Sequence, residues 1–437
     1  MADLYDLLTR QAGEGDHGVA EGARAANREV DVVTFGCRLN GYESEKLRER
    51  AAADGVADAV VFNTCAVTAE AVRQARQAIR KARRERPGAR LVVTGCAAQI
   101  DPASFAAMDE VDLVLGNAEK TLPGALLSEA RVRLGDIFSA ALPSSSGGGA
   151  RGLKSRARAY VEVQNGCDHR CTFCVIPFGR GNSRSVPAAQ AVNEVRALAE
   201  AGYAEVVLTG VDLTSWAEGG AALGDLVAAI LAEVPELPRL RLSSIDAAEI
   251  DPALLACLAR EHRLAPHLHL SLQAGDDLML KRMKRRHSTA DALALIASVR
   301  RARPDTAFGA DLIAGFPTET EAAFERTLAF VEAAGLAYLH VFPFSPRPGT
   351  PAARMPQLPR EVVKNRAARL REAGAAALVR HLERQTGRRI EALVEEPGRA
   401  RAADFTEIAF AGPAPVGAIT PLRIVGHDGR RALGEVA

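Results

Sequence analysis

Long apolar runs are missing from this chain of 437 residues. No stretch approaches the roughly 20 apolar residues that a membrane-spanning helix needs. The first thirty residues lack the basic end and apolar stretch of a secretory signal. We therefore expect a cytoplasmic protein without a membrane partner. The net charge of +1 gives no sign of a polyanionic partner, and the length indicates two or three domains.

An even set of cysteines is also missing, because the chain has seven. An odd number in a chain without a secretory signal argues against a disulfide framework. Reduced thiols that act as ligands or in catalysis fit better. Six of the seven fall into two groups of three, and neither group has a fourth cysteine. Cys257 stands alone and is expected to be a core residue.

Positive charge is not spread evenly but is concentrated in residues 73–90 and 281–287. Either run alone is best interpreted as a solvated helix face. Two such runs beside cysteine-bearing motifs favour a nucleic-acid partner.

Three β-branched runs near the N-terminus each end in a cysteine. They are EVDVVTFGC (29–37), DAVVFNTC (58–65) and ARLVVTGC (89–96). Helical stretches at 43–54 and 66–86 alternate with them, which predicts a doubly wound parallel sheet. Because the carboxyl ends of parallel strands lie along one edge, Cys37, Cys65 and Cys96 should converge there. One such cysteine could be a small buried hydrophobe, but three favour zinc or an iron–sulfur cluster.

The second group is the C-x3-C-x2-C loop of Cys167, Cys171 and Cys174. It follows a predicted strand at 159–166. Further strands are predicted at 205–210, 239–244, 267–275, 309–317 and 338–346, with helical segments between them. These six units predict a partial β/α barrel, in which active sites lie at the carboxyl ends of the strands.

Zinc is the main alternative for this loop. His169 is a poor fourth ligand because it lies two residues from Cys167, and no second ligand pair follows in this domain. Three thiolates instead suit a four-iron cluster whose fourth iron stays open for a reacting ligand.

The loop, with Phe173 before its last cysteine, resembles that of the radical S-adenosylmethionine (SAM) superfamily, in which SAM fills the open position. From about residue 29 to the C-terminus the chain resembles methylthiotransferases. The segments that carry this likeness include TFGCRLNGYESE (34–45), NTCAVTAEA (63–71), LHLSLQAGDDLMLKRMKRRH (268–287) and ADLIAGFPTET (310–320). The first two are similar to the MtaB branch, which acts on N6-threonylcarbamoyladenosine (t6A) at tRNA position 37. Sister branches act on N6-isopentenyladenosine in tRNA or on an aspartate of a ribosomal protein.

The resemblance implies two [4Fe–4S] clusters and SAM as cofactors. Cys167, Cys171 and Cys174 would hold the radical-generating cluster, and Cys37, Cys65 and Cys96 an auxiliary cluster that carries the sulfur. The implied partners are tRNA and a small electron-transfer protein of the flavodoxin or ferredoxin type, and a monomer is expected. The C2–H bond of adenine is unactivated, so a radical cofactor would carry the difficult step.

SAM contacts are expected from residues of the cysteine loop and from polar residues at strand ends. A turn or cap hydrogen bond is the alternative for each polar residue. The expected residues are Phe173, Ile176, Arg184, Thr209, Gly210, Asp212, Ser244, Ser271 and Gln273.

The last part of the chain alternates like strands at 388–396, 405–412, 418–426 and 431–437. This predicts a small all-β barrel, and it resembles the OB-like, RNA-binding TRAM domain. Arg399 and Arg401 would contact phosphate or lie in a solvated loop. The expected division is an extension (1–28), an N-terminal domain (29–142), a Ser/Gly-rich linker (143–154), a radical SAM domain (155–375) and the TRAM-like domain (376–437).

Two other classes compete with this interpretation. A cobalamin-binding radical SAM enzyme usually carries D-x-H-x-x-G in its N-terminal domain, and residues 30–140 contain no histidine. A non-catalytic iron–sulfur protein that binds RNA is the other, and two open three-thiolate sets argue against it.

Overall fold

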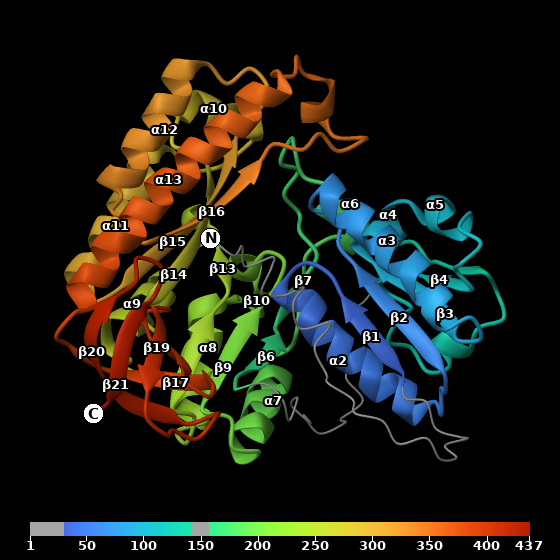
Figure 1. The fold of residues 1–437 in the computed structure, drawn as a ribbon, viewed down its shortest axis with the longest axis horizontal. Helices are drawn as coiled ribbons and strands as arrows, with labels where there is room; N and C mark the ends of the chain where they lie inside the picture. The colour runs from blue at the N-terminus through green and yellow to red at the C-terminus, as the bar shows by residue number, and fades with distance from the viewer. Residues whose placement is uncertain (1–29, 141–156) are drawn as a thin grey trace. The chain divides into compact units, whose positions relative to one another are not determined.

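The computed structural model describes residues 30–140 and 157–437 (Figure 1). The expected N-terminal extension and Ser/Gly linker lie outside the described residues. The chain forms two compact units. In the described part, unit 1 holds residues 30–140, 166–169 and 174–184, and unit 2 holds the rest.

Unit 1 is built on the parallel sheet that the sequence predicted. Its strands lie in chain order: β1 (Asp31–Thr34), β2 (Ala59–Thr64), β3 (Arg90–Gly95), β4 (Leu113–Leu115) and β5 (Val132–Arg133). The helical elements are α2 (Arg38–Ala53), α3 (Ala69–Glu85), α4 (Cys96–Ile100), α5 (Pro102–Ala106), the 3-10 turn η2 (Ala125–Leu127) and α6 (Ile176–Arg180).

Helices cover both faces of this sheet because side chains alternate along each strand. Val61 of β2 packs with Leu47 of α2 on one face. Phe62 packs with Ile79 of α3 on the other face. Figure 1 shows α2 and α3 on either side of β1 and β2.

Unit 2 contains the strands of the expected partial barrel, and the predicted strand 239–244 is divided into two, which lie in different sheets. One sheet has the order β12 (Arg239–Leu242), β9 (Glu205–Thr209), β6 (Ala159–Glu162). The other has the order β13 (Ser244–Ile245), β14 (His267–Gln273), β15 (Ala307–Ala314), β16 (Tyr338–Pro343). All these pairings are parallel. Short pieces are β7 (Gln164–Asn165), β8 (Arg184–Ser185, at the junction of the two units), β10 (Ala217–Glu218) and β11 (Ala221–Ala222).

The helices of unit 2 follow the strands as the sequence predicted. Several begin at a side chain that caps the first turn, including Asp251, Ser288 and Thr320. The helical elements are α7 (Ala188–Glu200), η3 (Leu213–Ser215), α8 (Leu223–Glu233), η4 (Ala247–Glu249), α9 (Pro252–Arg260), α10 (Asp277–Met283), α11 (Thr289–Ala302), α12 (Glu321–Ala333), η5 (Pro351–Arg354) and α13 (Arg360–Gln385).

The C-terminal barrel is closed and has five strands, one more than expected. They are β17 (Arg389–Glu396), β18 (Arg399–Ala402), β19 (Glu407–Ala411), β20 (Ile419–His427) and β21 (Ala432–Val436). The additional strand is β18, which lies where the sequence suggested a loop. Gly398, at φ +75°, makes the turn between β17 and β18 so tight that little connection remains.

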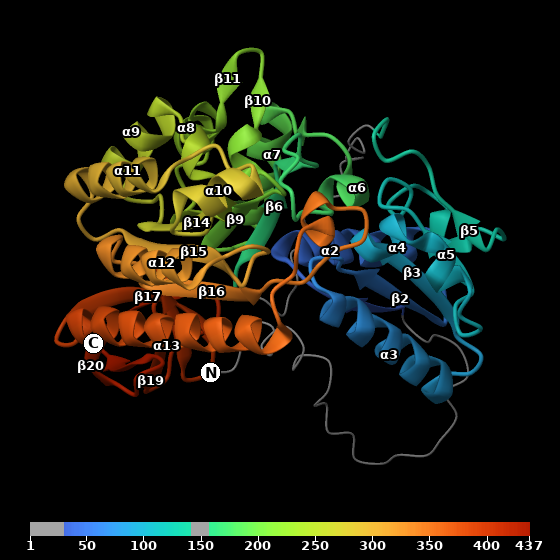
Figure 2. The ribbon, with the colours of Figure 1, turned by 90° about the horizontal axis from the view of Figure 1, so that it is seen from above.

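Helix α13 spans the domain boundary that we expected at residue 375. Leu382, on its last turns, belongs to the apolar core of the C-terminal barrel. Figure 2 shows α13 between α12 and the barrel strands.

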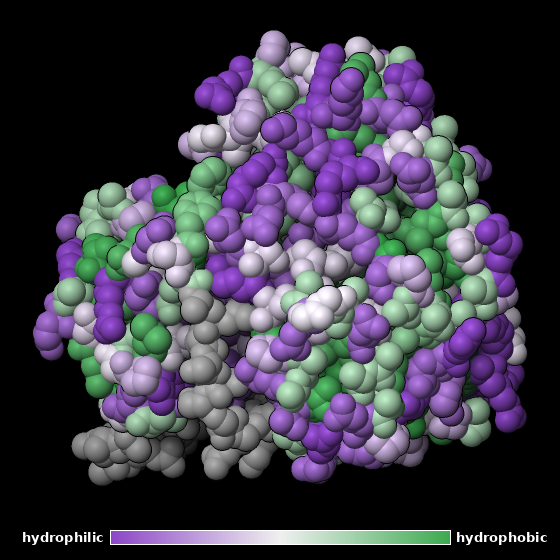
Figure 3. All heavy atoms as spheres, turned by 180° about the vertical axis from the view of Figure 1, so that it is seen from behind, coloured by the Kyte–Doolittle hydropathy of each residue, from purple (hydrophilic) through white to green (hydrophobic). Residues whose placement is uncertain are grey.

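The surface carries no obvious apolar belt on the face shown in Figure 3, where polar and apolar residues are interspersed. No described helix combines the length and apolar character that spanning a membrane requires.

Candidate metal and cofactor centre

The three strand-end cysteines of unit 1 follow neighbouring strands of its sheet. Cys37 follows β1, Cys65 follows β2, and Cys96 follows β3 at the start of α4. A negative charge on Cys37 or Cys96 raises the pKa of Cys65, so the three thiols are close enough for their charges to interact. Cys65 and Cys96 are buried, whereas Cys37 is exposed.

Two glycines shape the turns before these cysteines. Gly36 and Gly95 both have φ +94°, a left-handed conformation that favours glycine. A Cβ at Gly36 would lie 2.6 Å from the sulfur of Cys65, and one at Gly95 would lie 2.3 Å from the carbonyl oxygen of Thr64. The glycines therefore let each turn approach the next strand closely.

The Cys65 thiol needs a partner before it can ionise. Burial, and then the charges of Cys37 and Cys96, raise its pKa to about 12. Its sulfur accepts a hydrogen bond from the backbone N–H of Val67 at 3.5 Å. A thiol of this kind becomes a thiolate when a metal binds it and displaces the proton.

Arg180 adds a cation to the three-cysteine site of unit 1. It ends α6, and its Nε donates to the sulfur of Cys96 at 3.2 Å. Its other nitrogens bond both carboxylate oxygens of Glu43, at 2.6 and 2.8 Å. Lys120 lies 2.6 Å from the same carboxylate. Although burial opposes ionisation, Arg180 and Lys120 hold the pKa of Glu43 at about 2.

Sequence reasoning missed Arg180, Glu43 and Lys120. Arg180 lies 84 positions from the cysteine that it contacts, and no spacing rule links them. Only its place next to the second cysteine group offered a hint.

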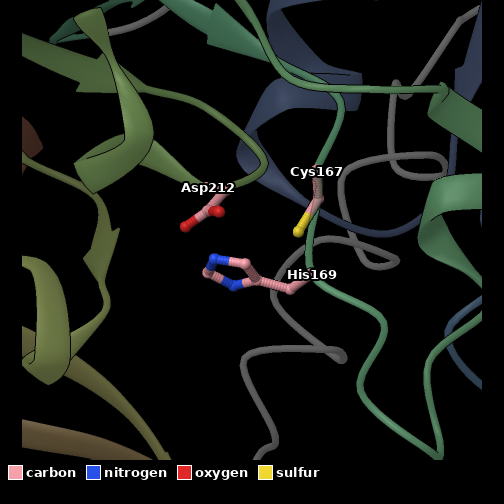
Figure 4. A group of neighbouring side chains, drawn as sticks. All are labelled: Cys167, His169 and Asp212. Carbon is pink, nitrogen blue, oxygen red and sulfur yellow. The ribbon is translucent and has the colours of Figure 1, made fainter. Parts of the chain in front are cut away.

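The first part of the C-x3-C-x2-C loop belongs to unit 1. Cys167 and His169 project from the same stretch of loop after β7 (Figure 4). The N–H of Cys167 bonds the carbonyl of Gly181 at 3.0 Å, and a Cβ at Gly166 would lie 1.8 Å from the carbonyl oxygen of Asn182. The sulfur of Cys174 accepts the N–H of Ile176 at 3.5 Å. The loop is therefore held tightly by its own backbone.

The middle of the loop belongs to unit 2. Phe173 packs against an apolar cluster that includes Met279 and Phe316. The Thr172 hydroxyl donates to the carbonyl of Arg282 at 2.8 Å. Cys171 lies 3.6 Å from a nitrogen of Arg285.

Arg285 is a further functional candidate that sequence reasoning missed. It lies in the basic run 281–287, but its side chain is buried and donates to Asp246 at 2.7 Å and to the carbonyl of Ser271 at 2.6 Å. His287 of the same run is buried as well. This run is therefore not simply a solvated basic face.

The other basic run, 73–90, is largely paired with acids of unit 1. Arg83 pairs with Asp112, and Arg86 with Asp31 and Asp58. Such pairing leaves less free charge for a nucleic acid than the sequence suggested.

The expected SAM residues of the second barrel strand lie at its carboxyl end. Thr209 ends β9 and is buried, and Gly210 and Asp212 follow it. Gln164, which sequence reasoning missed, accepts the N–H groups of Val211 and Asp212 at 3.0 and 2.8 Å. A Cβ at Gly210 would lie 2.9 Å from this Gln164 oxygen, so glycine permits the turn.

The remaining expected SAM residues are scattered over both units. Ser244 is exposed in β13, and Ser271 and Gln273 lie in the second half of β14. Gln273 has φ +73°, a strained conformation that is common at functional sites. Ile176 begins α6, and Arg184 donates to the carbonyls of Arg180 and Asn182. The roles of all these residues stay predictions.

Arg401 does not fit the expected contact with phosphate. It is buried, and it pairs with Glu395 at 2.8 Å and with Glu407 at 3.2 Å. Arg399 bonds Glu396. Both arginines are therefore engaged by acids of the barrel itself.

The donor chemistry of both cysteine groups fits iron–sulfur clusters. The six candidate ligands are all sulfur, which suits iron–sulfur clusters and zinc better than hard cations. Sulfurs of both groups accept backbone N–H groups, as ligand thiolates commonly do, and a buried arginine contacts one thiol in each group.

Two family models match these regions. The Radical SAM superfamily matches residues 161–331, and the family described as "Uncharacterized protein family UPF0004" matches residues 29–116. The fold and the two cysteine centres thus define a radical SAM enzyme with an added N-terminal domain.

Curated relatives narrow the family further. The chain is 45% identical over 406 residues to "Threonylcarbamoyladenosine tRNA methylthiotransferase MtaB" of Rickettsia prowazekii, covering 92% of this chain and 96% of the relative. It is 35% identical to the protein of that name from Aquifex aeolicus, covering 90% and 100%. A "tRNA-2-methylthio-N(6)-dimethylallyladenosine synthase" of Cereibacter sphaeroides is 36% identical, with 85% and 88% covered. The chain belongs to the radical SAM methylthiotransferase family.

The fold also resembles a solved radical SAM enzyme. The TsrM methyltransferase of Kitasatospora setae matches with a TM-score of 0.52 over 83% of this chain and 71% of that chain. The identity is 17%, so the likeness concerns the fold alone.

Proposed function

We propose that this protein inserts sulfur and a methyl group at C2 of t6A at tRNA position 37, giving 2-methylthio-t6A. The observation that carries the proposal is the presence of two groups of three free cysteines, one after the strands of the N-terminal sheet and one in the C-x3-C-x2-C loop, in a chain of this family. The 45% identity to a relative named for t6A supports this substrate over the sister ones.

The chain's own residues would divide the work between the two centres. Cys167, Cys171 and Cys174 would hold a [4Fe–4S] cluster for radical generation, and Cys37, Cys65 and Cys96 would hold the auxiliary one. When bound, these clusters and SAM supply a carbon-centred radical, the sulfur and the methyl group. The protein would position the base, keep water from the buried thiols and balance their charge through Arg180 and Arg285.

The partners and the location of the enzyme follow from the proposal. The substrate would be tRNA, bound partly by the C-terminal barrel, and the enzyme would act in the cytoplasm. A small flavodoxin- or ferredoxin-type protein would deliver electrons, and the enzyme would work as a monomer.

The second candidate is the sister reaction on N6-isopentenyladenosine. It is favoured by the 36% identity to the dimethylallyladenosine synthase of Cereibacter sphaeroides, over 88% of that protein. Both reactions would use the same centres, so only the recognised base distinguishes them.

The test is mass spectrometry of tRNA nucleosides from a strain that lacks the gene. We expect 2-methylthio-t6A to disappear while t6A remains. The wild-type gene and a Cys257→Ala variant should restore it, whereas Cys65→Ala and Cys171→Ala should not. Cys257 is the matched control because it is a half-buried cysteine on α9 outside both groups.

Other outcomes redirect the proposal. Loss of the methylthio-isopentenyl nucleoside alone would transfer the function to the sister branch. No change in any methylthio nucleoside would refute a tRNA substrate and make ribosomal protein the next material to examine.

A further inference from the structure

Arg180 lies at the centre of a buried polar network that reaches all three cysteine turns of unit 1. Its Nε donates to Cys96 at 3.2 Å, and one of its terminal nitrogens donates to the side-chain oxygen of Asn40 at 2.6 Å. The amide nitrogen of Asn40 in turn donates to the carbonyls of Phe35 and Thr64, at 2.7 and 3.1 Å. Phe35 lies two residues before Cys37, and Thr64 immediately precedes Cys65.

Helix α6, which ends at Arg180, packs directly against Cys96. A Cβ at Gly179, next to Arg180, would lie 3.2 Å from the Cβ of Cys96. Asn117 fixes this approach, because its amide nitrogen donates to the carbonyl of Gly179 at 2.5 Å. The position of Arg180 is thus set by the close approach of Gly179 to Cys96 and by the hydrogen bond from Asn117.

The charged side chains around Arg180 are buried, so solvent does not screen them. Arg180 is 2% exposed, Lys120 is 1% exposed and Glu43 is 5% exposed. Two cations and one carboxylate leave one net positive charge beside the thiols. A [4Fe–4S] cluster in its two-plus state that is held by three thiolates carries one net negative charge, so the two would cancel.

We propose that Arg180 is a positioning residue of the auxiliary centre, which orients Cys96 and, with Lys120 and Glu43, supplies the positive charge that balances a cluster bound there. This inference rests on the proposed function, because it requires a cluster on Cys37, Cys65 and Cys96. It adds that the segment which carries Cys174 also sets the electrostatics of the other centre.

The charge arrangement predicts opposite effects for two neighbouring substitutions. Removing the Arg180 cation destabilises the reduced, more negative state of the cluster and lowers its reduction potential. Removing the Glu43 carboxylate favours that state and raises the potential. A role limited to packing would not produce opposite signs.

The experiment uses the full chain with Cys167, Cys171 and Cys174 changed to alanine, so that only the auxiliary centre can load. The variants Arg180→Gln, Arg180→Lys, Glu43→Gln and Lys120→Gln are reconstituted without oxygen. Iron per chain is counted, and the potential is measured by a redox titration followed by electron paramagnetic resonance. Arg366→Gln is the matched control, because Arg366 is 4% exposed and pairs with Glu319 at 2.8 Å in unit 2.

We expect Arg180→Gln and Lys120→Gln to lower the equilibrium constant for reduction of the cluster at least tenfold. For a one-electron couple this is a reduction potential that is 59 mV lower. Glu43→Gln should raise the equilibrium constant by a similar factor. Arg180→Lys and Arg366→Gln should stay within tenfold of the parent.

The inference is overturned if iron-loaded variants share one potential, or if Glu43→Gln and Lys120→Gln shift it in the same direction. If Arg180→Gln holds no iron but Arg180→Lys does, the charge is required and the inference stands. If both Arg180 variants lose iron, the directions in which Glu43→Gln and Lys120→Gln shift the reduction potential decide: opposite directions support the inference and the same direction overturns it. If the parent itself binds no iron, or binds it equally after Cys65→Ala, the proposed function fails instead.

Discussion

Replacing Gly95 by alanine tests whether the turn before Cys96 is as tightly fixed as the structure indicates. Gly95 has φ +94° and ψ −174°, a region that is nearly closed to other residues and costs about 1–3 kcal/mol. The new methyl group would also lie 2.3 Å from the backbone oxygen and 2.4 Å from the backbone nitrogen of Thr64. Overpacking of this kind costs about 1–3 kcal/mol more.

The expected total loss in the free energy of unfolding is roughly 2–6 kcal/mol. That is a large fraction of the roughly 5–15 kcal/mol by which a domain is stable. Amides of β2 and β3 should lose protection first, because the clash lies between these strands. The assay is urea unfolding of the metal-free protein by far-UV circular dichroism, with hydrogen exchange of peptides from 59–64 and 90–95.

Gly55→Ala is the matched control for this substitution. Gly55 follows α2 in the same unit and also has a positive φ, of +67°, but a Cβ there would meet nothing within 4 Å. Strain alone should cost about 1–2 kcal/mol at Gly55. If the two variants differ by less than about 0.5 kcal/mol, the close contact with Thr64 is wrong.

Three further predictions follow from unit 2. Burial opposes ionisation of Glu395, but Arg401 and Arg158 lower its pKa from 4.5 to about 2. The ionised carboxylate therefore contributes about 3 kcal/mol of stability above pH 5, which is lost as the pH falls toward 2. Urea unfolding midpoints from about pH 7 to 2 should show this loss, and Glu395→Gln should flatten the profile. Arg285→Gln should reduce the rate of 5′-deoxyadenosine formation at least tenfold, because Arg285 contacts Cys171. Arg326→Gln is the control: it loses only a half-exposed pair with Asp276 and should not reduce the rate. Equal rates for the two variants would contradict a role for Arg285. Gln164→Ala, which frees the N–H groups of residues 211 and 212, should raise the KM for SAM more than it lowers kcat, and an unchanged KM would refute the role of that turn.

Much of the fold was predictable because its signals are local. The alternation of β-branched runs with helical stretches predicted the sheet of unit 1 and the barrel strands of unit 2. The parallel arrangement then predicted that Cys37, Cys65 and Cys96 follow their strands at one edge of the sheet. Strand β18 was missed because four residues of alternating Arg and Ala after a turn give no apolar period. Helix α13 was not predicted because its pattern is only weakly amphipathic, and its last turns pack in the core of the C-terminal barrel.

What the sequence could not predict is which charges turn inward. Arg285 and Arg401 lie in basic stretches that looked solvated, and each is buried because a carboxylate from another element faces it. A buried arginine is tolerated only when such a partner compensates its desolvation. The tertiary structure determines which carboxylate becomes the partner, so neither the amino-acid composition nor the hydrophobic periodicity predicts it.

One thiol of each cysteine group has the same electrostatic arrangement. In unit 1, Arg180 contacts Cys96 and is held by Glu43, and in unit 2, Arg285 contacts Cys171 and is held by Asp246. A lone cation beside a thiol would pair with it fully and hold the side chain rigidly as a thiolate–guanidinium pair. A carboxylate on the far side shares the cation, so the arginine stays oriented toward the sulfur without being its exclusive partner. Because each thiol set must take up a metal and then tolerate changes of charge, a shared cation suits both centres better than an exclusive partner would.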